Sequence, residues 1–178
     1  MEQRPICRAN VALDFALFGR TMSEILETWD SLAAGVGCPF DGERPESNEH
    51  WDKVAQLSTS TLYLHKIQTY RGYSLLVYDG PHATRLDQLP RDAANAFMSD
   101  LIRVQRAMAE VLKPDHVNLE LLGNAIPHLH WHVVPRYKAD PRWGSPIWMS
   151  DVQLMPRVVL SEADRTSLII GLRSALAV

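Results

Sequence analysis

Residues 123–136 read GNAIPHLHWHVVPR, and the middle of this stretch decides how the chain folds. His128, His130 and His132 alternate with apolar residues, which is the pattern of a β-strand with one polar and one apolar face. The spacing predicts a strand over 129–134, with the imidazoles in a row about 7 Å apart. The apolar residues between the histidines would then face the core.

The segments on both sides of this strand predict the rest of a sheet. The expected elements are a helix over 21–34, strands over 61–65 and 73–78, a long helix that ends before Pro114, strands over 117–122 and 129–134, and a last helix that begins at Ser161. The long helix has one apolar stripe, formed by Phe97, Leu101, Val104, Met108 and Val111. This order predicts an α+β fold, a single domain over 1–178 with its core at about 38–137.

The composition is that of one globular domain. The chain has 178 residues, of which 46% are hydrophobic and 22% charged. The net charge of −3 argues against a nucleic acid partner, because such proteins usually present a basic face. We expect no membrane partner, since no apolar run approaches the roughly 20 residues that span a bilayer. No signal peptide is visible, and Cys7 and Cys38 are too few for a disulfide framework, so we expect a cytoplasmic protein.

The histidine row has three interpretations. The imidazoles could simply be solvated, but three of the chain's seven histidines in strict alternation make this the least favoured. They could share a metal ion, since imidazole is a common ligand of zinc, copper and iron. They could also perform phosphoryl chemistry, with one imidazole as nucleophile and another as donor to phosphate oxygens.

The residues around the row favour phosphoryl chemistry. Gly123, Asn124 and Ala125 form a turn directly before it. Backbone N–H groups beside a glycine approach an anion closely, and the Asn124 amide would add a donor. Arg136 has the same strand parity as the histidines and would add positive charge.

The whole stretch 123–136 resembles the signature of the histidine-triad (HIT) superfamily, in which alternating histidines follow a Gly-Gln/Asn-Ser/Thr-like segment. The resemblance covers about residues 38–137, and the ending Pro135-Arg136 looks more like the dinucleoside polyphosphate hydrolase branch than the phosphoramidase branch. It implies a HIT-like fold, an antiparallel sheet with a long helix packed on one face and flanking terminal helices. It also implies a homodimer, in which the apolar stripe of the long helix would serve either the core or the interface.

The resemblance also implies roles for the site residues. His130 would be the nucleophile and would form a covalent nucleotidyl-histidine intermediate. His132 would bond an oxygen of the phosphate or of the leaving group, and His128 would orient the site. The turn 123–125, with the Asn124 amide, would bind the transferred phosphate and offset its developing charge. No cofactor is implied, and we expect no metal in the row.

Two positions depart from the family pattern. Many members carry a fourth histidine in the turn before the second strand, and it helps to set the hydrogen bonding of the triad. This chain has Tyr73 at that position. Eight residues earlier, many members have Asn or Asp near the ribose, and this chain has His65. We expect His65 either to contact the nucleotide or to lie on the surface.

Residues 38–41 read CPFD and resemble the Cys-x-x-Cys half of a structural zinc site in some relatives. Asp41 replaces the second thiolate, although structural zinc prefers sulfur and nitrogen ligands. His82 would be the further ligand. The favoured interpretation is the simpler one, in which Cys38 is a small residue in a turn and His82 a loop residue.

Two functions remain open. The first is a nucleotide hydrolase or nucleotidyl transferase that cleaves at an α-phosphorus of a dinucleoside polyphosphate or a nucleoside phosphoramidate. The second is a nucleotide-binding regulatory protein with weak turnover. The intact histidine row favours the first, and the missing fourth histidine favours the second. Trp131 is expected in the core, while Trp143 and Trp148, in the extension 138–178, would cover the nucleotide pocket.

Overall fold

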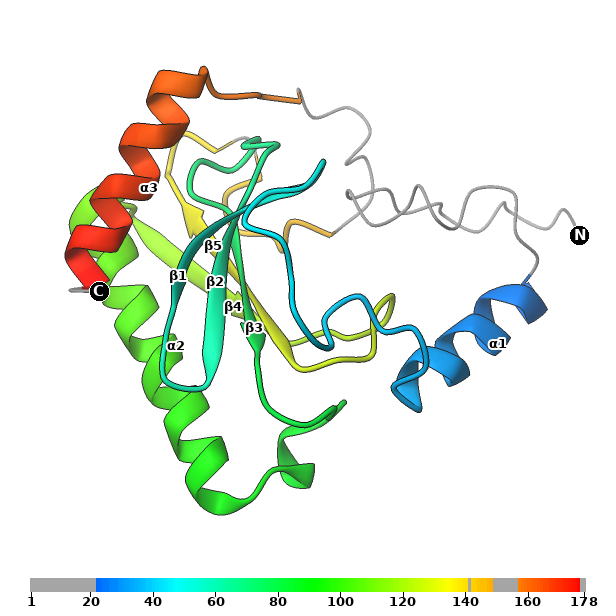
Figure 1. The fold of residues 1–178 in the computed structure, drawn as a ribbon. Coiled ribbons are helices and arrows are strands. Elements are labelled where there is room, and N and C mark those ends of the chain that lie inside the picture. Colours follow the sequence, from blue (N-terminus) through cyan, green and yellow to red (C-terminus); the bar gives the residue numbers. More distant parts are fainter. Residues whose placement is uncertain (1–21, 141, 149–156, 177–178) are drawn as a thin grey trace, which may run out of the picture.

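A sheet with helices on both sides forms the architecture of the computed structural model, which describes residues 22–140, 142–148 and 157–176 (Figure 1). The elements in chain order are α1 (Met22–Ala33), β1 (Trp51–Gln56), β2 (Ser60–His65), β3 (Ser74–Tyr78), the short 3₁₀ helix η2 (Leu86–Gln88), α2 (Arg91–Leu112), β4 (His116–Glu120), β5 (His130–Arg136) and α3 (Glu162–Leu176). The predicted α+β class is therefore confirmed.

The five strands form one antiparallel sheet in the order β1-β2-β3-β5-β4. Strand β5, which carries the histidines, lies between β3 and β4. Val77 of β3 is opposite His130, and Leu75 is opposite His132. Hydrogen bonding on both sides makes β5 a rigid support for these two side chains.

Helices α2 and α3 pack on one face of the sheet, and α1 lies on the opposite side (Figure 1). The main core lies between the sheet and α2 and α3. The predicted stripe of the long helix faces this core: Phe97, Leu101, Val104 and Met108 are buried, and Val111 packs against them. The stripe therefore serves the intramolecular core and not an interface.

The face of the sheet away from α2 carries a second apolar cluster, and this cluster surrounds the histidines. Its buried members are Cys38, Phe40, Trp51, Tyr63, Tyr70, Tyr73, Leu75, Val77, Ile126, Val134 and Ile147. Cys38, Phe40, Ile126 and Ile147 come from loops that flank the sheet. A buried environment with several aromatic rings is therefore built over β3 and β5.

The structure adds one strand to the prediction and shifts both ends of β4 and of β5. The sequence predicts four strands, but Trp51–Gln56 forms a fifth, β1, at the sheet edge. Strand β4 begins and ends earlier than predicted, and β5 runs from His130 to Arg136. His128 consequently lies in the bend before β5, so its place in the row is set by a loop and not by strand pairing.

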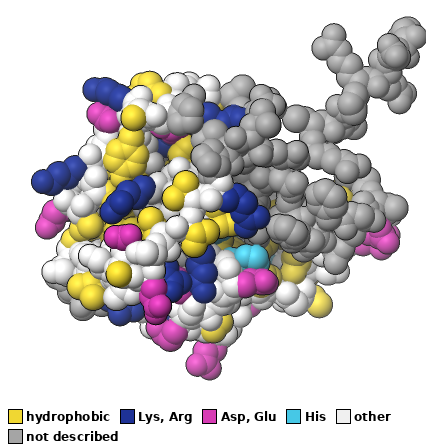
Figure 2. Space-filling view, turned by 90° about the horizontal axis from the view of Figure 1, so that it is seen from above, with side chains coloured by type: hydrophobic (Ala, Val, Ile, Leu, Met, Phe, Trp, Pro, Cys, Tyr) yellow, Lys and Arg dark blue, Asp and Glu magenta, His cyan; other side chains and the backbone are white. Residues whose placement is uncertain are grey.

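Surface features agree with the charge of the chain. On the face seen in Figure 2, Lys and Arg side chains are scattered among acidic and hydrophobic ones and do not form a continuous basic patch. Within the described part of the chain, no helix combines the length and the apolar character needed to cross a membrane.

Candidate active site

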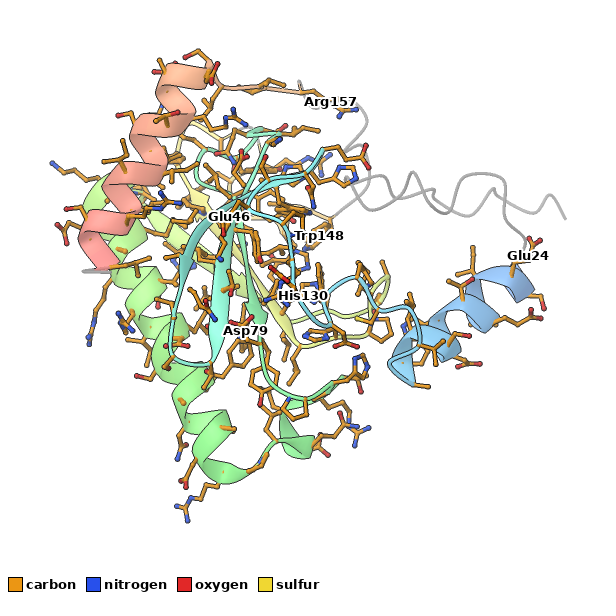
Figure 3. The ribbon with its side chains drawn as sticks, viewed as in Figure 1. Glu24, Glu46, Asp79, His130, Trp148 and Arg157 are labelled. Carbon is orange, nitrogen blue, oxygen red and sulfur yellow. The ribbon has the colours of Figure 1, made fainter. Side chains whose placement is uncertain are left out.

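The three histidines lie together on the face of the sheet away from α2 and α3. The rings of His130 and His132 are 4.9 Å apart between centroids, and the Phe40 ring contacts His128 at 5.7 Å and His130 at 5.2 Å. All three histidines are almost fully buried, with 2–3% of each exposed. Figure 3 shows His130 beside Trp148, on the side of the strands opposite α2 and α3. The predicted row is therefore a compact, enclosed cluster.

Backbone hydrogen bonding sets the tautomer of His130. Its Nδ1–H donates to the main-chain carbonyl of His128 at 2.7 Å. In a neutral ring this leaves the Nε2 of His130 without a proton and with its lone pair available. Burial and the neighbouring His128 lower the pKa of His130 to about 4, so the ring is neutral at pH 7. This is the state that a nucleophilic imidazole requires.

His132 is held by two aromatic residues. The hydroxyl of Tyr73 lies 2.9 Å from His132 Nδ1, and the Trp148 ring meets the imidazole edge-on at 4.9 Å. The Trp148 Nε1–H donates to the carboxylate of Glu120, which lies opposite His132 on β4. Burial and the nearby His130 lower the pKa of His132 to about 3.

Arg44 holds the Phe40 loop over the row. Its guanidinium donates to the carbonyl of Phe40, to the Tyr63 hydroxyl at 3.0 Å and to the carboxylate of Asp79. Asp79 also accepts a bond from Thr61 at 2.8 Å. Because the Phe40 ring touches His128 and His130, this network shields the two imidazoles from solvent on that side.

A second cluster of ligating groups adjoins the row. Cys38, Asp41, His82 and His128 each offer one ligand atom, and these atoms lie within 4.8 Å of one another. His82 Nδ1 lies 2.9 Å from Asp41, and His128 Nδ1 lies 3.2 Å from the same carboxylate and 3.6 Å from Cys38 Sγ. One thiol, two imidazoles and one carboxylate are a donor set that zinc accepts. The residues therefore fit a divalent metal ion.

Comparisons with known proteins agree with this geometry. A family model described as the HIT domain matches residues 47–139, more than half of the chain. The chain belongs to the HIT domain family. No curated protein sequence matches it significantly.

Solved histidine-triad structures resemble this HIT domain. A histidine triad protein from Bradyrhizobium japonicum shares 27% identity and a TM-score of 0.67, over 76% of this chain and 97% of its own. One from Marinobacter aquaeolei shares 24% identity and a TM-score of 0.63, over 72% and 90%. A hypothetical histidine triad nucleotide-binding protein from Sulfolobus tokodaii shares 17% identity and a TM-score of 0.54, over 84% and 91%. The last two show the fold alone.

The other predicted site residues of the HIT domain occupy different environments. Asn124 and Ala125 are exposed in the turn before the row. Gly123 has φ +74°, which favours glycine, and its carbonyl accepts a bond from the α1 residue Trp29 at 3.2 Å. His65 is 2% exposed, so the prediction of a surface residue is wrong. Its Nε2 is buried without a partner among the described residues, beside the Trp51 ring.

Arg136 does not act as a free positive charge in this HIT domain, contrary to the prediction. It is buried and pairs with Asp140 at 2.6 Å, and it also donates to the carbonyls of Arg142 and Ser145. Arg136 therefore shapes the segment that leads to Trp148. Trp131 packs against the core, as predicted.

A cavity of about 330 Å³ lies at the other end of the β4–β5 pair. It is lined by His116, Asn118, Arg136, Trp143, Gly144, Ser145 and Pro146. The three histidines are absent from its lining, so Trp143 belongs to a separate hollow and not to the wall of the row.

The sequence does not identify Phe40 and Arg44 as residues of the site. Both lie in a loop before β1. The contacts of Phe40 with the row span about ninety positions of sequence, and Arg44 acts on the row only through Phe40. The only local signal is the apolar Phe40 within a polar segment, which is too common to identify a site residue.

Proposed function

We propose that this HIT domain is a nucleotide hydrolase or nucleotidyl transferase that cleaves at an α-phosphorus through a covalent intermediate on His130. The substrate class is a dinucleoside polyphosphate or a nucleoside phosphoramidate. The observation that carries the proposal is the bond from His130 Nδ1–H to the carbonyl of His128, which leaves Nε2 as a neutral nucleophile.

The surrounding residues supply the remaining requirements. His132 is close enough to bond an oxygen of the same phosphate, since its ring is 4.9 Å from that of His130. Phe40 and Trp148 exclude water, which strengthens hydrogen bonds to the developing charge. Asn124 and the backbone N–H groups of the turn 123–125 would contact the transferred phosphate, as the family resemblance implies.

The reaction proceeds in two displacements. The lone pair on His130 Nε2 forms a bond to phosphorus, and the bond to the leaving group breaks with its electron pair on the departing atom. An amine leaving group also takes up a proton, from a donor in the site or from solvent, as this bond breaks. Water, or a second acceptor, then attacks phosphorus, and the electron pair of the nitrogen–phosphorus bond returns to Nε2. In hydrolysis one proton of the water passes to solvent.

Rapid-quench labelling tests this proposal. Wild-type protein mixed with α-labelled substrate and quenched in base should retain label on His130, because a phosphorus–imidazole bond is base-stable and acid-labile. His130→Ala should lose label and more than about 10⁴-fold in kcat, and His132→Ala about 10²–10⁴-fold. His116→Ala, an exposed histidine on β4, is the matched control. Near-normal turnover by His130→Ala would contradict the proposal.

The alternative is a nucleotide-binding regulatory protein with weak turnover. The replacement of the fourth histidine by Tyr73 favours it. Its signature would be tight nucleotide binding that survives in His130→Gly, with no label on the wild-type protein and no product beyond background. A ligand present at 100 times its Kd raises stability by about 2.7 kcal/mol, so a thermal shift reveals the binding.

We also propose that the cluster of Cys38, Asp41, His82 and His128 binds a divalent metal ion such as zinc. When bound, the ion would cross-link the loop 38–41 to the row, a structural role. Because His128 also provides the carbonyl that holds His130, the cluster would fix the position of the nucleophile without touching the substrate.

A further inference from the structure

Tyr73 occupies a tightly determined position beside His132. Its hydroxyl is 2.9 Å from His132 Nδ1, and the two rings are nearly parallel, at 16°. The residue before it, Gly72, has φ +92°, and a Cβ there would lie 2.3 Å from the side chain of Leu112. Tyr73 and His132 are both about 95% buried or more. The phenol therefore has a fixed place and a fixed partner.

The direction of this hydrogen bond follows from proton counting. Among the described residues, the rings that face His132 are those of His130, Tyr73, His65 and Trp148, and none of these is an anion. The Glu120 carboxylate lies opposite His132 on β4, where it accepts the Trp148 Nε1–H. A neutral His132 carries one ring proton. If Nδ1 held it, the phenol proton would have no acceptor among the described contacts of Tyr73. If Tyr73 donates to Nδ1 instead, the His132 proton is on Nε2, where it can meet substrate.

We propose that Tyr73 is a positioning residue that fixes His132 as a hydrogen-bond donor and prevents it from acting as a general acid. The site would then select substrates whose leaving groups depart as stable anions, namely phosphoanhydrides, over phosphoramidates of alkyl amines. This inference rests on the proposed function and decides between its two substrate classes.

The proton balance of the first displacement carries the argument. With a phosphoanhydride, the bond between phosphorus and the bridging oxygen breaks, and the electron pair stays on that oxygen. The Nε2–H of His132 donates a hydrogen bond to it, and no proton is transferred. The departing phosphate is already a stable anion, so the step is complete.

An alkyl amine cannot leave in the same way. Its nitrogen must receive a proton as the phosphorus–nitrogen bond breaks, because the amide anion is far too basic to depart. If His132 gave up its Nε2 proton, Nδ1 would have to take the proton of Tyr73, and a buried phenolate would result. Burial and the Glu120 carboxylate raise the pKa of Tyr73 and oppose this transfer. A histidine at position 73 could accept and return a proton, which a phenol in this place cannot.

A series of adenosine 5′-phosphoryl compounds tests the inference. The leaving groups would be a nucleoside polyphosphate, a nitrophenol, an unsubstituted phenol and an alkyl amine, in order of rising basicity. We expect kcat/KM of the wild type to fall at least about 100-fold from the anhydride to the amine. Tyr73→His should reduce the ratio of kcat/KM for the anhydride to kcat/KM for the amine by about 10²-fold or more, which is the size of a general-acid contribution. Tyr73→Phe should keep the ratio and lower every rate.

A spectroscopic measurement makes the test independent of how the variants fold. Nitrogen-15 chemical shifts distinguish histidine tautomers, and wild-type His132 should show a protonated Nε2 and an unprotonated Nδ1 at neutral pH. A proton on Nδ1, or a charged imidazole, would overturn the inference. So would an unchanged ratio in an active Tyr73→His variant, or equal wild-type rates for anhydride and amine. If no substrate is turned over with dependence on His130, the proposed function fails instead.

Discussion

His128 turns the unprotonated side of its ring toward a carboxylate. Its Nε2–H donates to the carbonyl of Tyr78 at 2.9 Å, so a neutral ring has a lone pair on Nδ1. That nitrogen lies 3.2 Å from Asp41 Oδ1, and burial lowers the pKa of His128, which disfavours a charged ring. A nitrogen lone pair and a carboxylate repel each other at this distance, and a cation between them would remove the repulsion. Cys38 and His82 complete a ligand set for one.

Metal analysis should therefore find about one zinc ion for each chain purified without chelator. Chelation should lower the thermal midpoint, because an ion that binds only the folded state stabilises it. Asp41→Ala should lose the ion and the response to chelator, while Asp87→Ala, an exposed carboxylate of η2, should keep both. Less than one tenth of an ion per chain, with no effect of chelator, would contradict the site. The covalent step on His130 requires no ion, so we expect labelling to survive mild chelation.

Asp100 should be a major determinant of stability. It is 1% exposed in α2 and accepts bonds from the Ser58 hydroxyl at 2.8 Å, the Thr59 N–H at 2.9 Å and the Ser60 hydroxyl at 2.8 Å, which closes the β1–β2 turn. Asp100→Ala should lower the free energy of unfolding by roughly 3 kcal/mol, since it leaves buried donors without an acceptor. Urea denaturation measures this loss. Asp100→Asn should lose less, and the exposed Glu110→Ala should stay within about 0.5 kcal/mol of wild type.

Periodicity predicts the elements whose packing is local. The apolar stripe of α2 and the alternation in β5 each indicate their element, because one side of a regular element faces the core. Strand β1 lacks such a signal. Its Asp52 is 8% exposed and is neutralised by Arg165 of α3, a partner 113 positions later. A charged residue within a short segment predicts a loop, because the sequence does not show the distant partner that neutralises the charge in the folded protein.

In the candidate site too, the sequence predicts the positions of the strand residues but not those of the loop residues. The alternation of His130 and His132 predicts their common face, because strand geometry alone sets it. Phe40 and Trp148 reach these rings through loops, and no local rule predicts where a loop places a side chain. The proximity of His128 to Cys38 likewise depends on a bend whose conformation is set by tertiary contacts.

The homodimer implied by the family resemblance remains a prediction. The stripe of α2 first considered for it is buried, but Met98 and Ile102 are exposed by 38% and 46%, one turn apart on the outer side of the same helix. Sedimentation should show about twice the 20.1 kDa of one chain. The double variant Met98→Glu/Ile102→Glu should sediment as a monomer. Ile170→Glu, at an exposed position of α3, should remain a dimer. A single-chain species alone at micromolar concentration would rule the dimer out.

Acid should destabilise the fold through its buried histidines. The pKa of His65 and of His130 is lowered to about 4, and that of His132 to about 3, mainly by burial. In the unfolded chain these groups titrate near their ordinary value of about 6.5. Between pH 6.5 and 4 the unfolded state therefore binds more protons, so stability is complete above pH 6.5 and is lost as pH falls toward the folded values. From pH 7 to pH 5 each histidine should remove about 1–2 kcal/mol from the free energy of unfolding. Urea denaturation at several pH values measures this slope, and His132→Gln should reduce it by the share of one group. A stability that is flat from pH 7 to pH 5 would show that these imidazoles are accessible to protons in the folded protein.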